Sequence, residues 1–291
     1  MQMHTESAWA KLNISLDIGE KRSDGFHSMK MIMQSISLCD TIELELTEDG
    51  KITADTTLPY IPADERNLAV KAAKKYFETI DRKDLGAKMY IHKRIPVGAG
   101  MAGGSSDAAA VLRLLNRLSP DPLSAAELLG IAETVGSDVA FCVQGGTALA
   151  EGRGEILTPL CDFPSCRFVV CKPKFSISTP ELFNSFDRLK THVHPDTAGL
   201  IEALKNQSIP EICRRMYNVF EDVEDRRMKT VAEIKSRLMD GGAVGAIMTG
   251  TGSAVFGVFK DDAMDVDALV KALKAEYGFA AAAVPVNQIS I

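Results

Sequence analysis

The stretch Pro96-Val-Gly-Ala-Gly-Met-Ala-Gly-Gly-Ser-Ser-Asp-Ala-Ala-Ala110 combines closely spaced glycines with a serine pair, directly before an apolar pattern of helical spacing. Glycine has no side chain, so the backbone can approach a ligand closely and adopt positive φ. Serine and aspartate suit a helix N-terminus, and the apolar pattern runs on to Ser119-Pro120. Amide groups at the start of a helix bind anions, because the helix dipole is positive there. The stretch therefore predicts a phosphate-binding loop that opens a helix. The residues with this geometry are Gly98, Gly100, Gly103, Gly104, Ser105, Ser106 and Asp107.

Two better-known loops share part of this pattern. Gly98, Gly100 and Gly103 satisfy G-x-G-x-x-G, the dinucleotide-binding pattern, which should follow a buried parallel strand. The preceding residues 89–96 instead alternate apolar and polar and end at a proline, as in a half-exposed antiparallel strand. Gly104 stands where a P-loop carries its lysine, so the main point charge of that mechanism is missing. A glycine-rich turn without a ligand stays open but rarely needs so many glycines and serines.

Length and charge limit the classes of protein to consider. With 291 residues and 46% hydrophobic content, the chain can bury a large core and form two domains. A net charge of −6 argues against a general nucleic-acid or membrane surface. The first residues lack the basic and apolar regions of a signal peptide, and no apolar run is long enough to span a membrane. We expect a soluble cytoplasmic protein, a monomer or homodimer, with small-molecule partners and without nucleic-acid or membrane partners.

The spacing of the cysteines and histidines does not indicate a metal-binding site. The six cysteines show no C-x-x-C pair and no zinc-finger spacing, which favours reduced thiols. His192 and His194 form an H-x-H pair, but they lie in a polar stretch that is typical of a loop. A dedicated protein site for a metal ion is therefore not identified.

Periodicity predicts a mixture of helices and strands. Without regular βαβ alternation, the order favours an α+β fold with mixed and antiparallel sheets and flanking helices. We expect one domain over residues 1–157 and another over 158–291, with the last strand able to return to the first. The expected strands are 41–46, 89–96, 139–143, 168–171, 246–248, 254–259 and 280–285. The expected helices are 67–80, the one after the glycine loop, 124–135, 180–190, 209–221, 223–239 and 262–276.

Three further segments carry chemically useful side chains. The strand-like run 10–15 places Lys11 and Asn13 on one face. Asp138 lies between a helix end and an apolar run, and residues 248–254 form a second loop rich in glycine and hydroxyl groups. Taken singly, these features also suit a solvated charge, a turn residue and a hairpin turn.

Together, the Lys11-Leu-Asn run, the glycine loop and the 249–253 loop resemble the three motifs of the GHMP kinases, in the same order and over almost the whole chain. The resemblance implies a two-domain α+β fold with the active site in the cleft between an N-terminal ATP-binding domain and a C-terminal domain. Segments 22–28, 136–141 and 150–155 are similar to one branch of the family, which acts on an alcohol linked to cytidine diphosphate. Three positions depart from that branch: Met101 replaces a usual leucine, Ala140 a usual proline and Phe26 a frequent tyrosine.

This branch phosphorylates the 2-hydroxyl of a cytidine-diphosphate-linked methylerythritol in non-mevalonate isoprenoid biosynthesis, with ATP and Mg²⁺. The resemblance makes Asp138 the base for the attacking hydroxyl and Lys11 the cation that offsets charge on the alkoxide. Phosphoryl transfer needs mainly positioning and charge stabilisation, which loop amides and ATP-bound Mg²⁺ supply. The loop residues implied in ATP binding are Pro96, Gly98, Gly100, Met101, Ala102, Gly103, Gly104, Ser105 and Ser106.

The resemblance also assigns a substrate site. Phe26 and His27 map to the residues that bind cytosine, and Phe183 to the aromatic residue on the other face of the base. Asn13 and Thr179 complete the expected substrate contacts. A mevalonate- or homoserine-type kinase would share the glycine motifs but not need Gly-Phe-His. A nucleotide-binding regulator without catalysis stays open too, although both Lys11 and Asp138 are retained.

Overall fold

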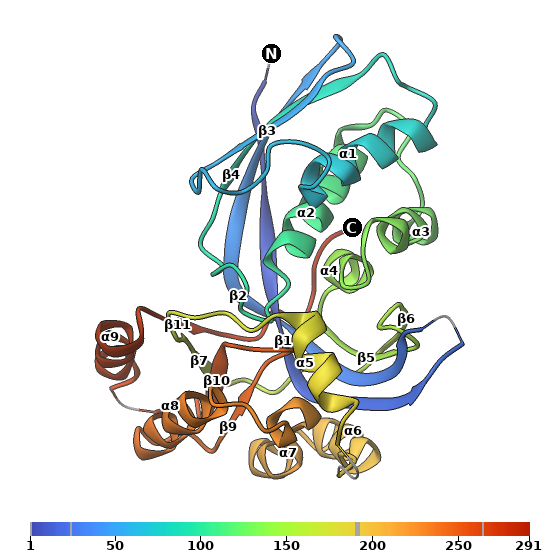
Figure 1. Ribbon diagram of the computed structural model, residues 1–291. Coiled ribbons are helices and arrows are strands. Elements are labelled where there is room, and N and C mark those ends of the chain that lie inside the picture. Colours follow the sequence, from blue (N-terminus) through green and yellow to red (C-terminus); the bar gives the residue numbers. More distant parts are fainter. Residues whose placement is uncertain (1, 24, 190–192, 264) are drawn as a thin grey trace.

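The computed structural model describes residues 2–23, 25–189, 193–263 and 265–291, and its strands form two sheets (Figure 1). The larger sheet has the order β3-β4-β2-β1-β8, with β5 paired to β2 and β6 to β5. The smaller sheet has the order β11-β7-β10-β9 and is antiparallel. The strands of the larger sheet are β1 (His4–Lys21), β2 (His27–Thr47), β3 (Ile52–Thr56), β4 (Gly86–His92), β5 (Thr147–Glu151), β6 (Ile156–Pro159) and β8 (Tyr217–Asn218). Those of the smaller sheet are β7 (Arg167–Lys172), β9 (Gly245–Met248), β10 (Val255–Phe259) and β11 (Phe279–Ala283).

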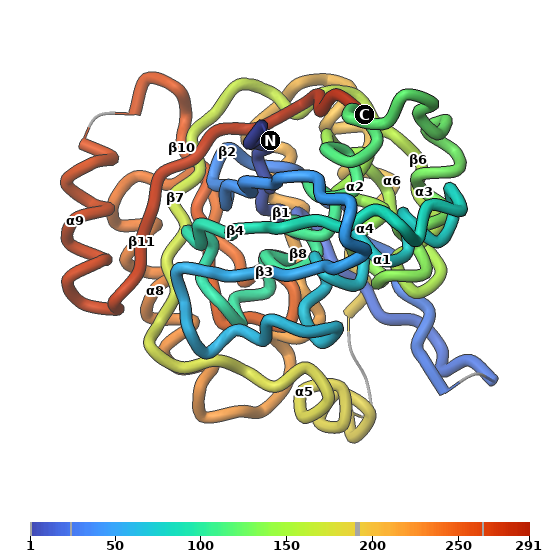
Figure 2. Tube along the Cα trace, turned by 90° about the horizontal axis from the view of Figure 1, so that it is seen from above, coloured from blue at the N-terminus to red at the C-terminus, as the bar shows by residue number. Residues whose placement is uncertain are grey.

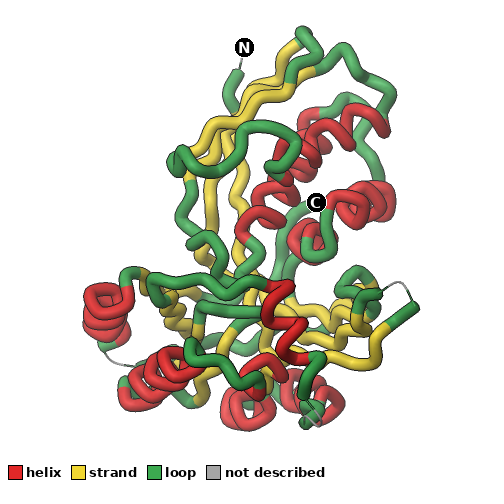
Figure 3. Tube along the Cα trace, viewed as in Figure 1, coloured by secondary structure: helices red, strands yellow, loops and turns green. Residues whose placement is uncertain are grey.

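Helices cover both sheets (Figures 1 and 3). Four of them, α1 (Leu68–Thr79), α2 (Gly103–Leu118), α3 (Ala125–Val135) and α4 (Val139–Gln144), pack together beside the larger sheet, with α2 against β1 and β2. Helices α8 (Met228–Asp240) and α9 (Val266–Tyr277) pack on the smaller sheet. The remaining helical elements are α5 (Thr179–Phe186), α6 (Thr197–Lys205), α7 (Ile209–Arg215) and the 3₁₀ turn η1 (Val219–Asp222). None of the helices in the described ranges is long and apolar enough to cross a membrane.

The expected α+β class is confirmed, and local signals place many elements correctly. Helix α1 begins after Asn67, whose side chain accepts from the Ala69 amide, and α3 begins with the capping box of Ser124 and Glu127. Strand β4 pairs antiparallel with β2, as its alternating pattern predicts, but it also pairs parallel with β3.

The strand expected over residues 139–143 is wrong, because this segment is helix α4. All five of these residues are buried in the larger core. A short apolar run that is buried on every side has no period that separates a strand from a helix. The helix expected over 209–221 ends at Arg215 and is followed by β8 and η1, while α6 was not predicted.

The C-terminal segment returns to the larger sheet, although β11 itself pairs with β7 in the smaller one (Figure 2). The Ser37 amide donates to the Val284 carbonyl at 2.9 Å, and the Val286 amide donates to the Ser35 carbonyl at 2.9 Å. Strand β8 likewise pairs with β1. The two halves of the chain are thus tied by crossing segments, and the domain boundary at 157/158 stays a prediction.

Candidate active site

A cavity of about 770 Å³ lies where the two halves of the chain meet. Its walls come from the β1–β2 hairpin, the glycine loop, the turn before α4, helix α5 and the 250–252 loop. The residues assigned from sequence that line it are Lys11, Asn13, Phe26, His27, Gly98, Gly100, Ala102, Ser105, Asp138, Thr179 and Phe183. Those that are not part of its lining are Pro96, Met101, Gly103, Gly104 and Ser106.

Backbone contacts join the three sequence motifs. The Lys11 amide donates to the Met101 carbonyl at 3.2 Å, which holds β1 against the glycine loop. The Thr249 hydroxyl accepts from the Asn13 amide at 3.0 Å and lies 3.3 Å from the Gly100 carbonyl. Segments far apart in sequence therefore meet at one end of the cavity.

Lys11 and Asp138 lie beside each other in the wall of the cavity. The Lys11 ammonium donates to Asn13 Oδ1 at 2.5 Å and lies 3.9 Å from Asp138 Oδ2. The lysine side chain is only 5% exposed, whereas Asp138 is 34% exposed. A buried ammonium requires polar partners, which Asn13 and Asp138 supply. The carboxylate stays accessible to a substrate hydroxyl.

The glycine loop leads into α2 as predicted, but its glycines differ in backbone conformation. Gly98 and Gly100 have φ of +63° and +72°, and Ala102 has φ of +57°. Gly103 and Gly104 are the first residues of α2 and do not use positive φ. Since Ala102 makes no side-chain capping bond, the amides of the first turn face the loop rather than a cap.

Ser105 and Ser106 point in different directions. Ser105 lines the cavity, while Ser106 is buried and donates to the Trp9 carbonyl at 2.7 Å. The Ser106 hydroxyl therefore holds α2 against β1, and Ser105 is the serine that lines the cavity.

Gly100 offers a direct test of this loop. A Cβ at this position would lie 2.2 Å from the Thr249 carbonyl oxygen, in a left-handed conformation that disfavours side chains. We expect Gly100→Val to weaken ATP binding about tenfold or more, because the two loops would separate. Calorimetric titration measures this, with Gly130→Ala as the control, since a Cβ there meets nothing within 4 Å. Unchanged affinity for ATP would exclude the loop from the nucleotide site.

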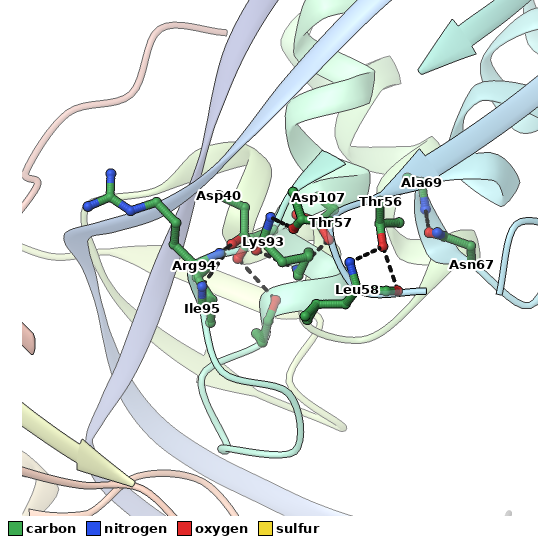
Figure 4. Close-up of polar contacts among 12 residues, drawn as sticks. Asp40, Thr56, Thr57, Leu58, Asn67, Ala69, Lys93, Arg94, Ile95 and Asp107 are labelled. Carbon is green, nitrogen blue, oxygen red and sulfur yellow. Dashed lines mark hydrogen bonds and ion pairs between the residues drawn. The ribbon is translucent and has the colours of Figure 1, made fainter. Parts of the chain in front are cut away.

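A buried charge cluster ties the two ends of the glycine loop together (Figure 4). The Lys93 ammonium donates to Asp40 Oδ2 at 2.5 Å and to Asp107 Oδ2 at 2.6 Å. Asp40 Oδ1 accepts from the amides of Arg94 and Ile95, at 2.8 Å for Ile95. Burial raises the pKa of Asp107 to about 7, against the nearby charge of Lys93. The sequence assigned Asp107 to the helix N-terminus and gave no sign of this cluster.

The raised pKa of Asp107 predicts a pH-dependent stability. Because this carboxyl binds its proton more tightly when folded, its contribution is fully present below its ordinary pKa of 3.8 and is lost as pH rises from there through about 7. We expect the parent to lose a few kcal/mol of unfolding free energy, relative to Asp107→Asn, over this interval. Denaturant titrations at a series of pH values measure the difference. A difference that stays constant with pH would contradict the assignment.

The other end of the cavity is aromatic. Phe26 is 57% exposed at the hairpin tip, with the Arg153 guanidinium 5.5 Å from its ring centroid. The His27 ring stacks on Phe183 at 5.8 Å between centroids. Thr179 begins α5, and its hydroxyl lies 2.9 Å from that of Thr251.

Sequence reasoning missed three charged residues of the cavity, Lys21, Arg153 and Asp187. Arg153 lies in a segment that did carry the resemblance, whereas Lys21 and Asp187 have no motif signal. Of the H-x-H pair, His192 lies outside the described residues, and His194 Nδ1 lies 2.9 Å from Asp17 Oδ1.

The fold and these joined motifs define a class of enzyme. The model of the GHMP kinases N terminal domain matches residues 67–146, and that of the GHMP kinases C terminal domain matches residues 200–278. The chain belongs to the GHMP kinase family, whose members transfer a phosphoryl group from ATP.

Its relatives point to one member of that family. A protein of Clostridium botulinum (strain Loch Maree / Type A3) named 4-diphosphocytidyl-2-C-methyl-D-erythritol kinase is 43% identical over 87% of this chain and 90% of its own length. A protein of the same name from the strain Eklund 17B is 44% identical over 93% of this chain and 95% of its own. The solved structure of a 4-(cytidine 5'-diphospho)-2C-methyl-D-erythritol kinase superimposes with a TM-score of 0.80 at 32% identity, covering 97% of this chain and 99% of the other.

Proposed function

We propose that this chain is an ATP-dependent kinase that phosphorylates the 2-hydroxyl of 4-diphosphocytidyl-2-C-methyl-D-erythritol, in non-mevalonate isoprenoid precursor biosynthesis. The observation that carries the proposal is the cavity, which combines the Lys11–Asp138 pair and the glycine loop with an aromatic, histidine-containing end. The named relatives support the same activity.

The chemistry assigned to Asp138 is proton transfer. Its exposed carboxylate would accept the proton of the substrate 2-hydroxyl as that oxygen forms a bond to the γ-phosphorus of ATP. The bond from the γ-phosphorus to the bridging oxygen breaks, and ADP leaves with that electron pair. The Lys11 ammonium, 3.9 Å from the carboxylate, would stabilise negative charge on the attacking oxygen.

The glycine loop would hold the transferred group. The amides of the first turn of α2, beside Gly98, Gly100 and Ser105, would bind the ATP phosphates without the lysine of a P-loop. Because phosphoryl transfer depends mainly on positioning and charge stabilisation, such a loop is sufficient for a kinase.

We assign Mg²⁺ to ATP rather than to a protein cage. Across the described residues, no group of three or more His, Cys, Asp and Glu side chains is placed to hold a metal ion. Mg²⁺ binds through few protein ligands when phosphates and water complete its shell. The ion would neutralise phosphate charge, and of the two serines assigned to the loop, Ser105 lines the cavity.

A substrate panel tests the proposal. The purified chain is expected to release ADP with 4-diphosphocytidyl-2-C-methyl-D-erythritol and not with mevalonate or homoserine, and ³¹P spectra would show a new phosphomonoester. Turnover of mevalonate or homoserine would move the chain to another branch. Binding of ATP without turnover of any alcohol would favour a regulator. A cytoplasmic location and the monomer or homodimer state stay predictions.

A further inference from the structure

Asp187 directly follows helix α5, lines the cavity and contacts the β1–β2 hairpin. Its Oδ2 accepts from Lys21 Nζ at 3.0 Å, and its Oδ1 lies 2.8 Å from His27 Nε2. Lys21 ends β1 and His27 begins β2, so one carboxylate bridges both sides of the hairpin. The hydrogen bond from Lys21 lowers the pKa of Asp187, which keeps this carboxylate charged at neutral pH.

The same helix also holds the His27 ring by its face and edge. Phe183 stacks on the ring at 5.8 Å with an angle of 27°, and Phe186 meets it edge-on at 6.3 Å. The second ring nitrogen, Nδ1, lies 3.2 Å from the Gly19 carbonyl. The orientation of His27 is thus fixed by four contacts, and Asp187 provides the charged one.

We propose that Asp187 is a positioning residue for the cytidine end of the substrate. By holding α5 to the hairpin, it sets the position of Phe183 relative to Phe26, which also lines the cavity. A base can lie between two aromatic walls only when their spacing is fixed, and fixing it beforehand reduces the entropy cost of binding. This inference rests on the proposed function.

Helix α5 has packing of its own that does not depend on Asp187. Phe183 and Phe186 both meet Phe220 of η1, at 4.9 Å and 6.0 Å between centroids. Asp187 is 30% exposed, so its amide variant leaves no buried cavity. The variant Asp187→Asn is therefore expected to fold, with weaker contacts between α5 and the hairpin.

The test measures two Michaelis constants for each variant. We expect Asp187→Asn to raise KM for the cytidine diphosphate alcohol about 5- to 20-fold, since the contacts to Lys21 and His27 are weakened, with KM for ATP unchanged. Asp187→Glu is expected to recover part of the loss, because it keeps the charge. Added salt should raise the alcohol KM of the parent more than that of Asp187→Asn. The matched control is Asp84→Asn, which removes an exposed aspartate paired with Arg82 outside the cavity lining.

Calorimetric binding of cytidine diphosphate separates this inference from the proposed function. Weaker binding to Asp187→Asn than to the parent, with ADP binding equal, would support the positioning role. Equal cytidine diphosphate affinity in both proteins, equal changes in both KM values, or no binding by the parent would overturn it. The proposed function fails on a different result, namely a parent that does not turn over the alcohol.

Discussion

Asp138→Asn is expected to lower turnover by about 10²–10⁴-fold, because the amide cannot accept the proton of the substrate hydroxyl. The side chain is nearly isosteric, and Asp138 makes no capping bond to α4, so the fold should be kept. ATP affinity should change little, since we assign the phosphate contacts to the glycine loop. A coupled assay of ADP release measures turnover, and calorimetry measures ATP binding.

Lys11→Met tests the other member of the pair. Turnover should fall here as well, because the ammonium 3.9 Å from Asp138 Oδ2 is removed while the apolar stem is kept. Asp84→Asn serves as the control for Asp138→Asn, since it removes an aspartate outside the cavity. Near-parent turnover in Asp138→Asn would exclude this residue as the base, whatever the result for Lys11→Met.

The glycine loop and the helix after it were predictable, because glycine conformation and apolar periodicity are local properties of the sequence. Glycine at positions 98 and 100 permits positive φ, and the apolar period of α2 follows without interruption. The same rules could not separate these glycines from Gly103, which has helical geometry. A Cβ on Gly103 would meet Ile95 and Lys93 in the interior, and only the three-dimensional packing shows this.

Contacts between distant segments set the limit of prediction. Residues 139–143 were expected to form a strand, because a segment that is buried on every side shows no apolar periodicity that would distinguish a strand from a helix. Packing against neighbouring core residues determines that this segment is a helix. The sequence predicts Asp107 only as a residue of the helix N-terminus. In the structure its side chain pairs with Lys93, which lies in the segment before the loop. Asp187 has no motif at all, and its two partners are more than 150 residues away in sequence. Side chains whose roles depend on such pairings require the fold.

Phe26→Ala and Phe183→Ala are each expected to raise KM for the cytidine diphosphate alcohol about 5- to 150-fold, with little change in KM for ATP. A base stacked on an aromatic ring gains about 1–3 kcal/mol, which corresponds to that range in affinity. Phe26 gives the cleaner result, because its side chain is 57% exposed and its loss leaves no hole in the core. The Arg153 guanidinium, 5.5 Å from the Phe26 ring centroid, stays in the wall of the cavity.

Phe183 needs a second variant, because its ring also packs on Phe220 at 4.9 Å and on His27 at 5.8 Å. Phe183→Leu keeps most of the apolar volume and removes the π-face. If stacking on the base is the cause, both Leu and Ala should raise the alcohol KM. If packing of α5 is the cause, Leu should behave as the parent and only Ala should lower thermal stability. Steady-state kinetics with each substrate varied in turn, together with thermal unfolding, separates the two causes. A parallel rise in both KM values for Phe26→Ala would exclude the hairpin tip from the cytidine site, because loss of a stacking contact to the base should not change KM for ATP.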